Sequence, residues 1–200
     1  MRIEPSGQIL GATVTDIDIG AALRPADFAA VLQGLGRHGV LHFPGQRLTA
    51  AALRDFSQRF GRIQATLTGR HHEPGMPEVG ILSNIIENGE PIGITDAGQD
   101  WHTDMSYNPT IGFLNELAHE ESERMLSMLF EHQLQPKYQY THRWTEDDVL
   151  VWDHIGTLHN AIADYGPDEH RLMKRCQVMA DRVFDPAFLE AVLPAAGLAV

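Results

Sequence analysis

The sequence is poor in cysteine. Its 200 residues contain one, Cys176, so no disulfide can form within the chain. The first seven residues, Met1 to Gly7, lack the apolar run of a secretory signal peptide. Disulfides and signal peptides are typical of oxidising compartments outside the cell. We therefore expect a protein of the reducing cytoplasm.

Long apolar runs and positive charges are also scarce. No uncharged apolar stretch approaches the roughly 20 residues that a membrane-spanning helix needs. There are 15 Lys and Arg residues against 27 Asp and Glu residues, which gives a net charge of −12. A chain this acidic repels phosphate backbones and anionic lipid. Neither nucleic acid nor a membrane is an expected partner.

The chain contains no internal repeat, no low-complexity tract and no linker, and at 22.2 kDa it is expected to form a single domain over residues 1–200. Motifs of the P-loop, H-E-x-x-H and G-x-S-x-G types are absent. A G-x-G-x-x-G match at Gly34–Gly39 ends a predicted helix and precedes a predicted strand. A dinucleotide site requires the opposite order, so this match predicts a helix end.

Hydrophobic periodicity predicts a chain made mainly of strands with a few helices. The first helix should start at Pro25 and stop at Gly36 to Gly39, and the second should run from the N-cap Thr49 to Gly61. A third helix is predicted at about 119–132. The predicted strands are a pair within 9–20, then 39–43, 78–82, 137–144, 148–153 and 171–180.

Histidine is abundant, with 11 residues, and one pair of side chains has the spacing of metal ligands. His102 and Asp104 are two positions apart, so on a strand both side chains point to the same side. Non-haem Fe(II) oxygenases bind iron through two histidines and one carboxylate on one face of an octahedron. His-x-Asp alone is a weak signal, and a second histidine is required.

Two arginines share one face of the last predicted strand. Arg171 and Arg175 are four residues, or ~13 Å, apart and point the same way as Met173. A guanidinium that faces inward needs an anion, and its planar fork suits a carboxylate or a sulfonate. The alternative is two exposed arginines on an edge strand.

Three segments together resemble the taurine/2,4-D dioxygenases, which are Fe(II)- and 2-oxoglutarate-dependent oxygenases. They are the run from His38 to Gln46 (HGVLHFPGQ), the run from Trp101 to Tyr107 (WHTDMSY) and the run from Asp148 to Asp153 (DVLVWD). The resemblance covers about residues 11–183. It implies a mainly β fold with flanking helices, a double-stranded β-helix of the jelly-roll, cupin-like type.

The resemblance also assigns roles to single residues. It makes His102, Asp104 and His159 the iron ligands, with His154 as a rival for the third position. In the family an arginine follows the distal histidine by about a dozen residues. Arg171 lies 12 residues after His159 but 17 after His154. This spacing favours His159 as the third iron ligand. Two further roles are implied: Arg171 would bind the 2-oxoglutarate carboxylate, and Arg175 and Met105 would contact the substrate.

The implied activity is hydroxylation of a small anionic organic substrate, a sulfonate or a carboxylate, with Fe(II), 2-oxoglutarate and O₂, and with release of succinate and CO₂. The resemblance is compatible with a homodimer or homotetramer. Two alternatives remain open at this point. One is a non-catalytic truncated homologue, and the other is a metal-dependent hydrolase that uses the same His/Asp/His set.

One departure from the family is large. The connection from Asp104 to His159 is short, whereas the family has a longer connection with several strands and a Gly-Gly-Asp-Thr segment. Too few residues follow His102 to complete the eight strands of a jelly roll. The middle strands are therefore expected to be absent from this sequence. The discontinuity falls near Phe113/Leu114 and indicates either an omitted segment or a truncated homologue.

Overall fold

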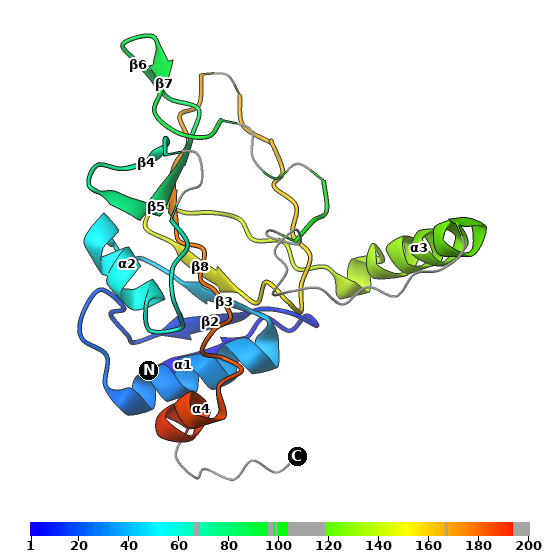
Figure 1. The fold of residues 1–200 in the computed structure, drawn as a ribbon, viewed down its shortest axis with the longest axis horizontal. Helices are drawn as coiled ribbons and strands as arrows, with labels where there is room; N and C mark the ends of the chain where they lie inside the picture. Colours follow the sequence, from blue (N-terminus) through cyan, green and yellow to red (C-terminus); the bar gives the residue numbers. More distant parts are fainter. Residues whose placement is uncertain (66–68, 96–97, 99, 104–118, 167, 194–200) are drawn as a thin grey trace. The chain divides into compact units, whose positions relative to one another are not determined.

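The computed structural model describes residues 1–65, 69–95, 98, 100–103, 119–166 and 168–193. In chain order the elements are β1 (Arg2–Pro5), β2 (Ala12–Thr15), α1 (Pro25–His38), β3 (Val40–Phe43), α2 (Ala50–Ser57), β4 (His72–Glu73), β5 (Met76–Ser83), β6 (Ile86–Glu87), β7 (Glu90–Pro91), α3 (His119–Gln133), the 3₁₀ helix η2 (Pro136–Tyr138), β8 (Val149–Trp152), β9 (Leu172–Arg175) and α4 (Pro186–Val192) (Figure 1). Among these residues no helix is both long and apolar enough to cross a bilayer.

The chain forms two compact units and crosses between them five times, once within α1. The first unit comprises residues 1–16, 34–45 and 102–159. The second comprises residues 17–33, 46–101 and 160–200. Each unit has its own sheet, so each is described separately below.

The sheet of the first unit has the strand order β1-β2-β3-β8. β2 and β3 are parallel, and the connection between them contains α1, as a parallel crossover requires. β3 and β8 are antiparallel, with Leu41 opposite Val151. Val14, Leu41 and Phe43 are fully buried and form the core of this unit. Alternation of apolar residues along β2 and β3 therefore places one face of the sheet inside.

Helix α1 ends where the glycine pattern predicts a stop, although not at its first glycine. Gly36 lies inside the helix, which continues to His38. Gly39 then adopts φ +68°, and its N–H donates to the carbonyl of Leu35 over 2.8 Å. This left-handed residue is the usual C-terminal stop, and β3 begins directly after it. The G-x-G-x-x-G match is thus a helix end followed by a strand, as predicted.

The second unit contains the sheet β4-β5-β9 and the separate hairpin β6-β7. All its pairings within named strands are antiparallel, and Gly80 of β5 lies opposite Arg175 of β9. Thr49 caps α2 as predicted, because its side chain accepts from the N–H of Ala52. The helix ends at Ser57, earlier than the predicted stop at Gly61.

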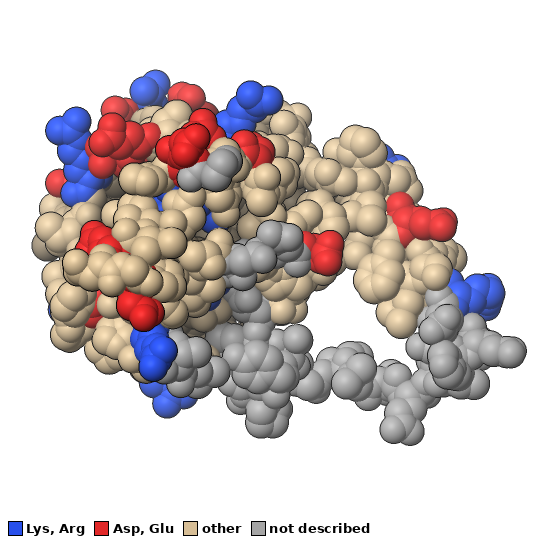
Figure 2. Space-filling view, turned by 90° about the horizontal axis from the view of Figure 1, so that it is seen from above, with Lys and Arg blue, Asp and Glu red and all other residues tan. Residues whose placement is uncertain are grey.

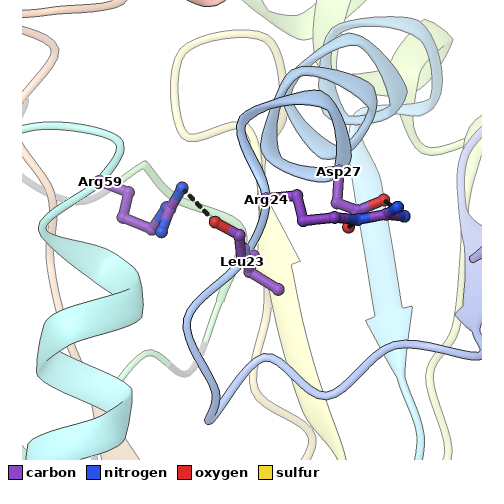
Figure 3. A network of polar contacts seen from close by, with 4 residues as sticks. All are labelled: Leu23, Arg24, Asp27 and Arg59. Atoms are coloured by element: carbon purple, nitrogen blue, oxygen red, sulfur yellow. Dashed lines mark hydrogen bonds and ion pairs between the residues drawn. The ribbon is translucent and has the colours of Figure 1, made fainter.

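Contacts around Arg59 hold the chain before α1 in the second unit. The Arg59 guanidinium lies 4.8 Å from the Phe28 ring centroid and donates to the carbonyl of Leu23 over 3.4 Å (Figure 3). Beside it, Arg24 and Asp27 form an ion pair of 2.7 Å, but the Arg24 side chain is 79% exposed. Exposed pairs contribute little to stability. The contact of the Arg59 guanidinium with the Phe28 ring is therefore more stabilising than the ion pair between Arg24 and Asp27.

Charged side chains of both signs share the surface. Figure 2 shows Lys and Arg side chains interspersed with Asp and Glu side chains on the face viewed. Ion pairs at the surface include the 2.9 Å contact of Arg2 with Asp16 and the 2.8 Å contact of Arg54 with Asp55. On this face the acidic excess does not gather into one patch.

Three predicted strands differ from the observed ones. Two strands are predicted within 9–20, but this range contains one strand, β2, whose partner is β1. The predicted strand 171–180 is shortened to β9. Residues 137–144 form no strand: Pro136 begins η2, and residues 139–144 follow without ladder pairing. Alternation predicts the direction of side chains, but it does not show whether a partner strand is available.

Helix α3 is present as predicted, but its apolar side chains are exposed. Of the residues that give it helical periodicity, Leu126, Leu129 and Phe130 are 46%, 49% and 50% exposed. Within the described residues this face has no apolar cover. The periodicity therefore identified the helix correctly but did not show whether its apolar face is covered.

Replacing Leu41 by Ala should lower the free energy of unfolding by about 2–5 kcal/mol, because a fully buried leucine leaves a cavity when it is shortened. The control is Leu172→Ala, at a side chain that is 54% exposed, which should change it by about 0.5 kcal/mol or less. Urea unfolding followed by circular dichroism measures both. Equal losses would contradict the core described here.

Candidate metal centre and arginine pair

His102 and His159 face each other across an isolated antiparallel bridge. The N–H of His102 donates to the carbonyl of His159 over 3.0 Å, and the N–H of His159 donates back over 2.9 Å. In such a pair both side chains lie on the same side of the bridge. The ring centroids are 4.2 Å apart, and both residues are half-buried. The structure thus brings together two of the three ligands that the sequence predicts.

Asp104 and Met105, the third predicted ligand and a predicted substrate contact, lie outside the described residues. The described chain reaches Thr103, directly after His102, and resumes at His119. Their roles stay predictions that follow from the sequence.

His154, the rival third ligand, lies close to the pair but has a different neighbour. Trp152 at the end of β8 donates its indole N–H to His154 Nδ1 over 3.0 Å. The His154 ring centroid is 5.2 Å from that of His159. His159, in contrast, is held to His102 by both backbone hydrogen bonds. The direct pairing favours His159 as the partner of His102.

Arg171 is held by contacts within the second unit. Its backbone N–H donates to Asn84 Oδ1 over 2.8 Å, and the Asn84 amide donates to the carbonyl of Glu169 over 2.8 Å. The guanidinium carbon lies 5.5 Å from the Tyr165 ring centroid, and Nε lies 3.2 Å from Met173 Sδ. The base of the side chain is therefore fixed, and its guanidinium is placed on an aromatic ring.

The predicted alternation along the last strand is present. Arg171, Met173 and Arg175 are half-buried, whereas Leu172 and Lys174 on the opposite face are exposed. The β5–β9 pairing sets this register, because Arg175 lies opposite Gly80. The arginine face is thus the more protected face of β9.

A third group of side chains was not identified from the sequence. His42 of β3, His142 and Asp148 each offer one ligand atom, and these three atoms lie within 4.8 Å of one another. Neither His42 nor His142 has a motif spacing to Asp148, so only the fold shows this cluster. It shares no residue with the predicted iron ligands.

Burial shapes the protonation of this cluster. Burial, followed by the proximity of His42, lowers the pKa of His142. Burial alone would raise the pKa of the Asp148 carboxyl, but the nearby His42 and the N–H of Thr145 leave it below its ordinary value. His142 is therefore kept neutral and Asp148 ionised near neutral pH.

Comparison with known proteins identifies the class. The sequence profile described as "Taurine catabolism dioxygenase TauD, TfdA family" matches residues 2–117 and 111–177. The chain belongs to this family, which is a family of oxidoreductases. The resemblance drawn from the three sequence segments is confirmed.

Curated relatives of the chain are named for different compounds. A pentalenolactone F synthase of Streptomyces arenae is 38% identical over 295 residues, covering 94% of this chain and 97% of the relative. An (S)-phenoxypropionate/alpha-ketoglutarate-dioxygenase of Delftia acidovorans is 30% identical over 122 residues, covering 56% of this chain. That match spans only 39% of the relative's length, and a match to the pentalenolactone F synthase of Streptomyces avermitilis spans 38%.

Solved structures show the same fold. A taurine dioxygenase from Burkholderia xenovorans superposes with a TM-score of 0.71 at 19% identity and covers 88% of each chain. The structure of AAD-2 in complex with Mn(II) and N-oxalylglycine superposes with a TM-score of 0.66 at 17% identity, covering 88% of this chain and 97% of the other. The predicted jelly-roll fold class is confirmed.

Replacing His159 by Ala should lower the bound Fe(II) by about one equivalent, because it removes one of two imidazoles that share a side of the bridge. The matched control is His154→Ala, which should keep the iron because His102 and His159 stay paired. Iron content after anaerobic loading and desalting decides between them, with folding checked by circular dichroism. Retention in His159→Ala and loss in His154→Ala would assign the third ligand to His154.

Proposed function

We propose that this protein is an Fe(II)- and 2-oxoglutarate-dependent dioxygenase that hydroxylates a small anionic organic substrate and releases succinate and CO₂. The observation that carries the proposal is the bridge between His102 and His159, with both imidazoles on one side and their centroids 4.2 Å apart. Family membership supplies the reaction class. We also propose that the protein acts in the cytoplasm.

The donor set fits ferrous iron. His102 and His159 supply two imidazole nitrogens, and Asp104 would supply the carboxylate, which completes the two-histidine, one-carboxylate set. When bound, the iron supplies the oxidising chemistry with 2-oxoglutarate and O₂. The protein's contribution is to hold both half-buried imidazoles on one side of the bridge.

Arg171 is proposed to bind the distal carboxylate of 2-oxoglutarate. Its guanidinium is planar and permanently charged, and it can hold a carboxylate through two parallel hydrogen bonds. The contacts with Asn84 and Tyr165 restrict its position before the ligand binds. Restricting a long side chain in advance lowers the entropy that binding costs.

Arg175 is proposed to bind the anionic group of the primary substrate. It lies on the half-buried face of β9, and Arg171, directly before the strand, is half-buried as well; the residue paired with Arg175 is Gly80, which has no side chain. A sulfonate or a carboxylate satisfies a guanidinium equally well, so this residue selects for charge and not for one compound. The relatives include enzymes named for phenoxypropionate and for alkylsulfate chemistry, which supports a small organic anion.

The central test is anaerobic addition of Fe(II) and 2-oxoglutarate to the protein, followed by visible spectroscopy. Chelation of the iron by 2-oxoglutarate should give a charge-transfer band, and admission of O₂ should give succinate in the presence of substrate. A metal-dependent hydrolase or a non-catalytic homologue would show no band. Its absence from folded, iron-loaded protein would contradict the proposal.

Replacing each of the two arginines should have a different effect on binding. Arg171→Gln should weaken 2-oxoglutarate binding about thirtyfold or more, since loss of a buried guanidinium partner costs roughly 2–5 kcal/mol and each ~1.4 kcal/mol is tenfold. Arg175→Gln should leave 2-oxoglutarate binding nearly intact, weaken substrate binding and permit slow, uncoupled decarboxylation. Titration of 2-oxoglutarate into the iron-loaded variants, followed at the charge-transfer band, measures the difference.

Lys174→Gln is the matched control for both arginine variants. Lys174 lies between Met173 and Arg175 on the exposed face of β9 and pairs with Glu73 at 2.9 Å. Its replacement removes a positive charge from the same strand. The affinities for 2-oxoglutarate and for the primary substrate should both stay unchanged. Equal weakening by Arg171→Gln and Arg175→Gln would mean that both arginines serve one anion.

The short connection between Asp104 and His159 is proposed to reflect a segment omitted near Phe113/Leu114. The family profile matches in two pieces that meet at residues 111–117. The alignment with the Streptomyces arenae relative spans 295 residues, more than the 200 of the chain, so a long stretch of that relative has no counterpart here. The first observation supports a discontinuity at the predicted place, and the second supports an omitted segment.

The polypeptide made from the natural gene should therefore be heavier than 22.2 kDa, because it would include the omitted middle strands. Intact-mass spectrometry of that polypeptide measures this directly. A mass of 22.2 kDa would show that the short connection is real and would favour the truncated, non-catalytic homologue.

A further inference from the structure

We propose that His42, His142 and Asp148 form a second metal site, which binds one divalent first-row transition ion such as Zn²⁺. All three residues belong to the first unit, and none is among the predicted iron ligands. The site does not depend on the proposed dioxygenase activity. It follows from how three buried side chains are arranged.

The fold brings the three residues together from separate segments. His42 lies on β3, Asp148 directly precedes β8, and the antiparallel β3–β8 pairing sets His42 opposite Leu150. His142 comes from the irregular chain before β8. The His42 and His142 ring centroids are 4.6 Å apart. His42 Nε2 lies 2.9 Å from Asp148 Oδ1, and His142 Nε2 lies 3.3 Å from Asp148 Oδ2.

These contacts are close but poorly aligned. The side chains of His42, His142 and Asp148 are 18%, 8% and 1% exposed. Nevertheless His42 Nε2, His142 Nε2 and Asp148 Oδ1 make no hydrogen bond to any of the described residues. Leaving a buried polar atom unsatisfied costs about 1–3 kcal/mol. Three ligand atoms that lie within 4.8 Å of one another and make no hydrogen bond to the described residues are placed as ligands of one ion.

The remaining polar atoms of the cluster are already occupied. Asp148 Oδ2 accepts from the backbone N–H of Thr145 over 2.8 Å, which leaves Oδ1 for the ion. The Tyr140 hydroxyl lies 3.4 Å from His142 Nδ1, so Nε2 is the nitrogen left for the ion. Gly11, at φ +90°, permits this placement, because a Cβ there would come within 2.5 Å of the Tyr140 ring.

The donor set selects the type of ion. Two imidazole nitrogens and one carboxylate oxygen suit Zn²⁺ and its neighbours, whereas Mg²⁺ and Ca²⁺ prefer oxygen ligands alone. A water would complete four-coordinate geometry. An ion here would join β3 to the chain on both sides of the turn before β8.

The test removes the predicted iron site first. Protein carrying His102→Ala is dialysed against Zn²⁺, and bound metal is measured by mass spectrometry. About one equivalent of Zn²⁺ should remain in this variant, and adding His142→Ala should remove it. Zn²⁺ should also raise the melting temperature of His102→Ala protein, because a ligand that binds only the folded state stabilises it. The matched control adds His132→Ala, at an exposed histidine of α3, and should change neither result.

A second variant keeps the test decisive if His142→Ala fails to fold. Asp148→Asn preserves the size of the side chain but removes the anionic ligand, and should weaken Zn²⁺ binding at least about tenfold. Loss of all bound zinc in His102→Ala alone would overturn the proposal, as would zinc binding unaffected by His142→Ala and Asp148→Asn. Failure of the dioxygenase proposal would appear instead as absence of the charge-transfer band while this zinc remains bound.

Discussion

The antiparallel pairing of β3 with β8 is the interaction on which the first unit depends. It joins Val40–Phe43 to Val149–Trp152, which are far apart in the sequence, and the adjoining N–H of Asp153 donates to the carbonyl of Gly39 over 2.7 Å. Leu41 and Phe43 are fully buried in this sheet. Burial of apolar area supplies the driving force for the pairing, and the left-handed Gly39 allows β3 to start directly after α1.

Both groups of proposed metal ligands depend on this pairing. The chain that leaves β8 passes through His154 and reaches His159, which pairs with His102. The chain that enters β8 contributes Asp148 to the cluster with His42. One pair of strands thus positions ligands before and after β8. Loss of the β3–β8 register would disturb both groups, even though they share no residue.

Local structure could be predicted from the sequence because its causes are local. Thr49 caps α2 through a bond to the N–H three residues on, and Gly39 ends α1 because it tolerates a positive φ. The alternation of exposed and half-buried residues along β9 follows from the two-residue period of a strand. In each case the residues that decide the structure lie within one element.

Pairings between distant segments could not be predicted from residue patterns alone. The resemblance to a family suggested that His102 and His159 belong to one site, but their direct backbone bridge appears only in the fold. The aromatic alternation at 137–144 indicates an extended chain, yet no strand pairs with it among the described residues. The amphipathic pattern of α3 likewise cannot show that its leucines are exposed. Burial depends on what the rest of the chain brings to a face.

The His42 cluster shows the same limit and explains why a buried carboxylate is tolerated there. An isolated ionised carboxylate in the interior is costly and would normally be neutralised. Asp148 stays ionised because the N–H of Thr145 and the side chain of His42 lie against it, while His142 is kept neutral by burial. Hydrogen bonds from both imidazoles could have completed this arrangement, but the observed alignment does not provide them. A bound cation would offset the remaining cost, since it interacts with all three atoms at once.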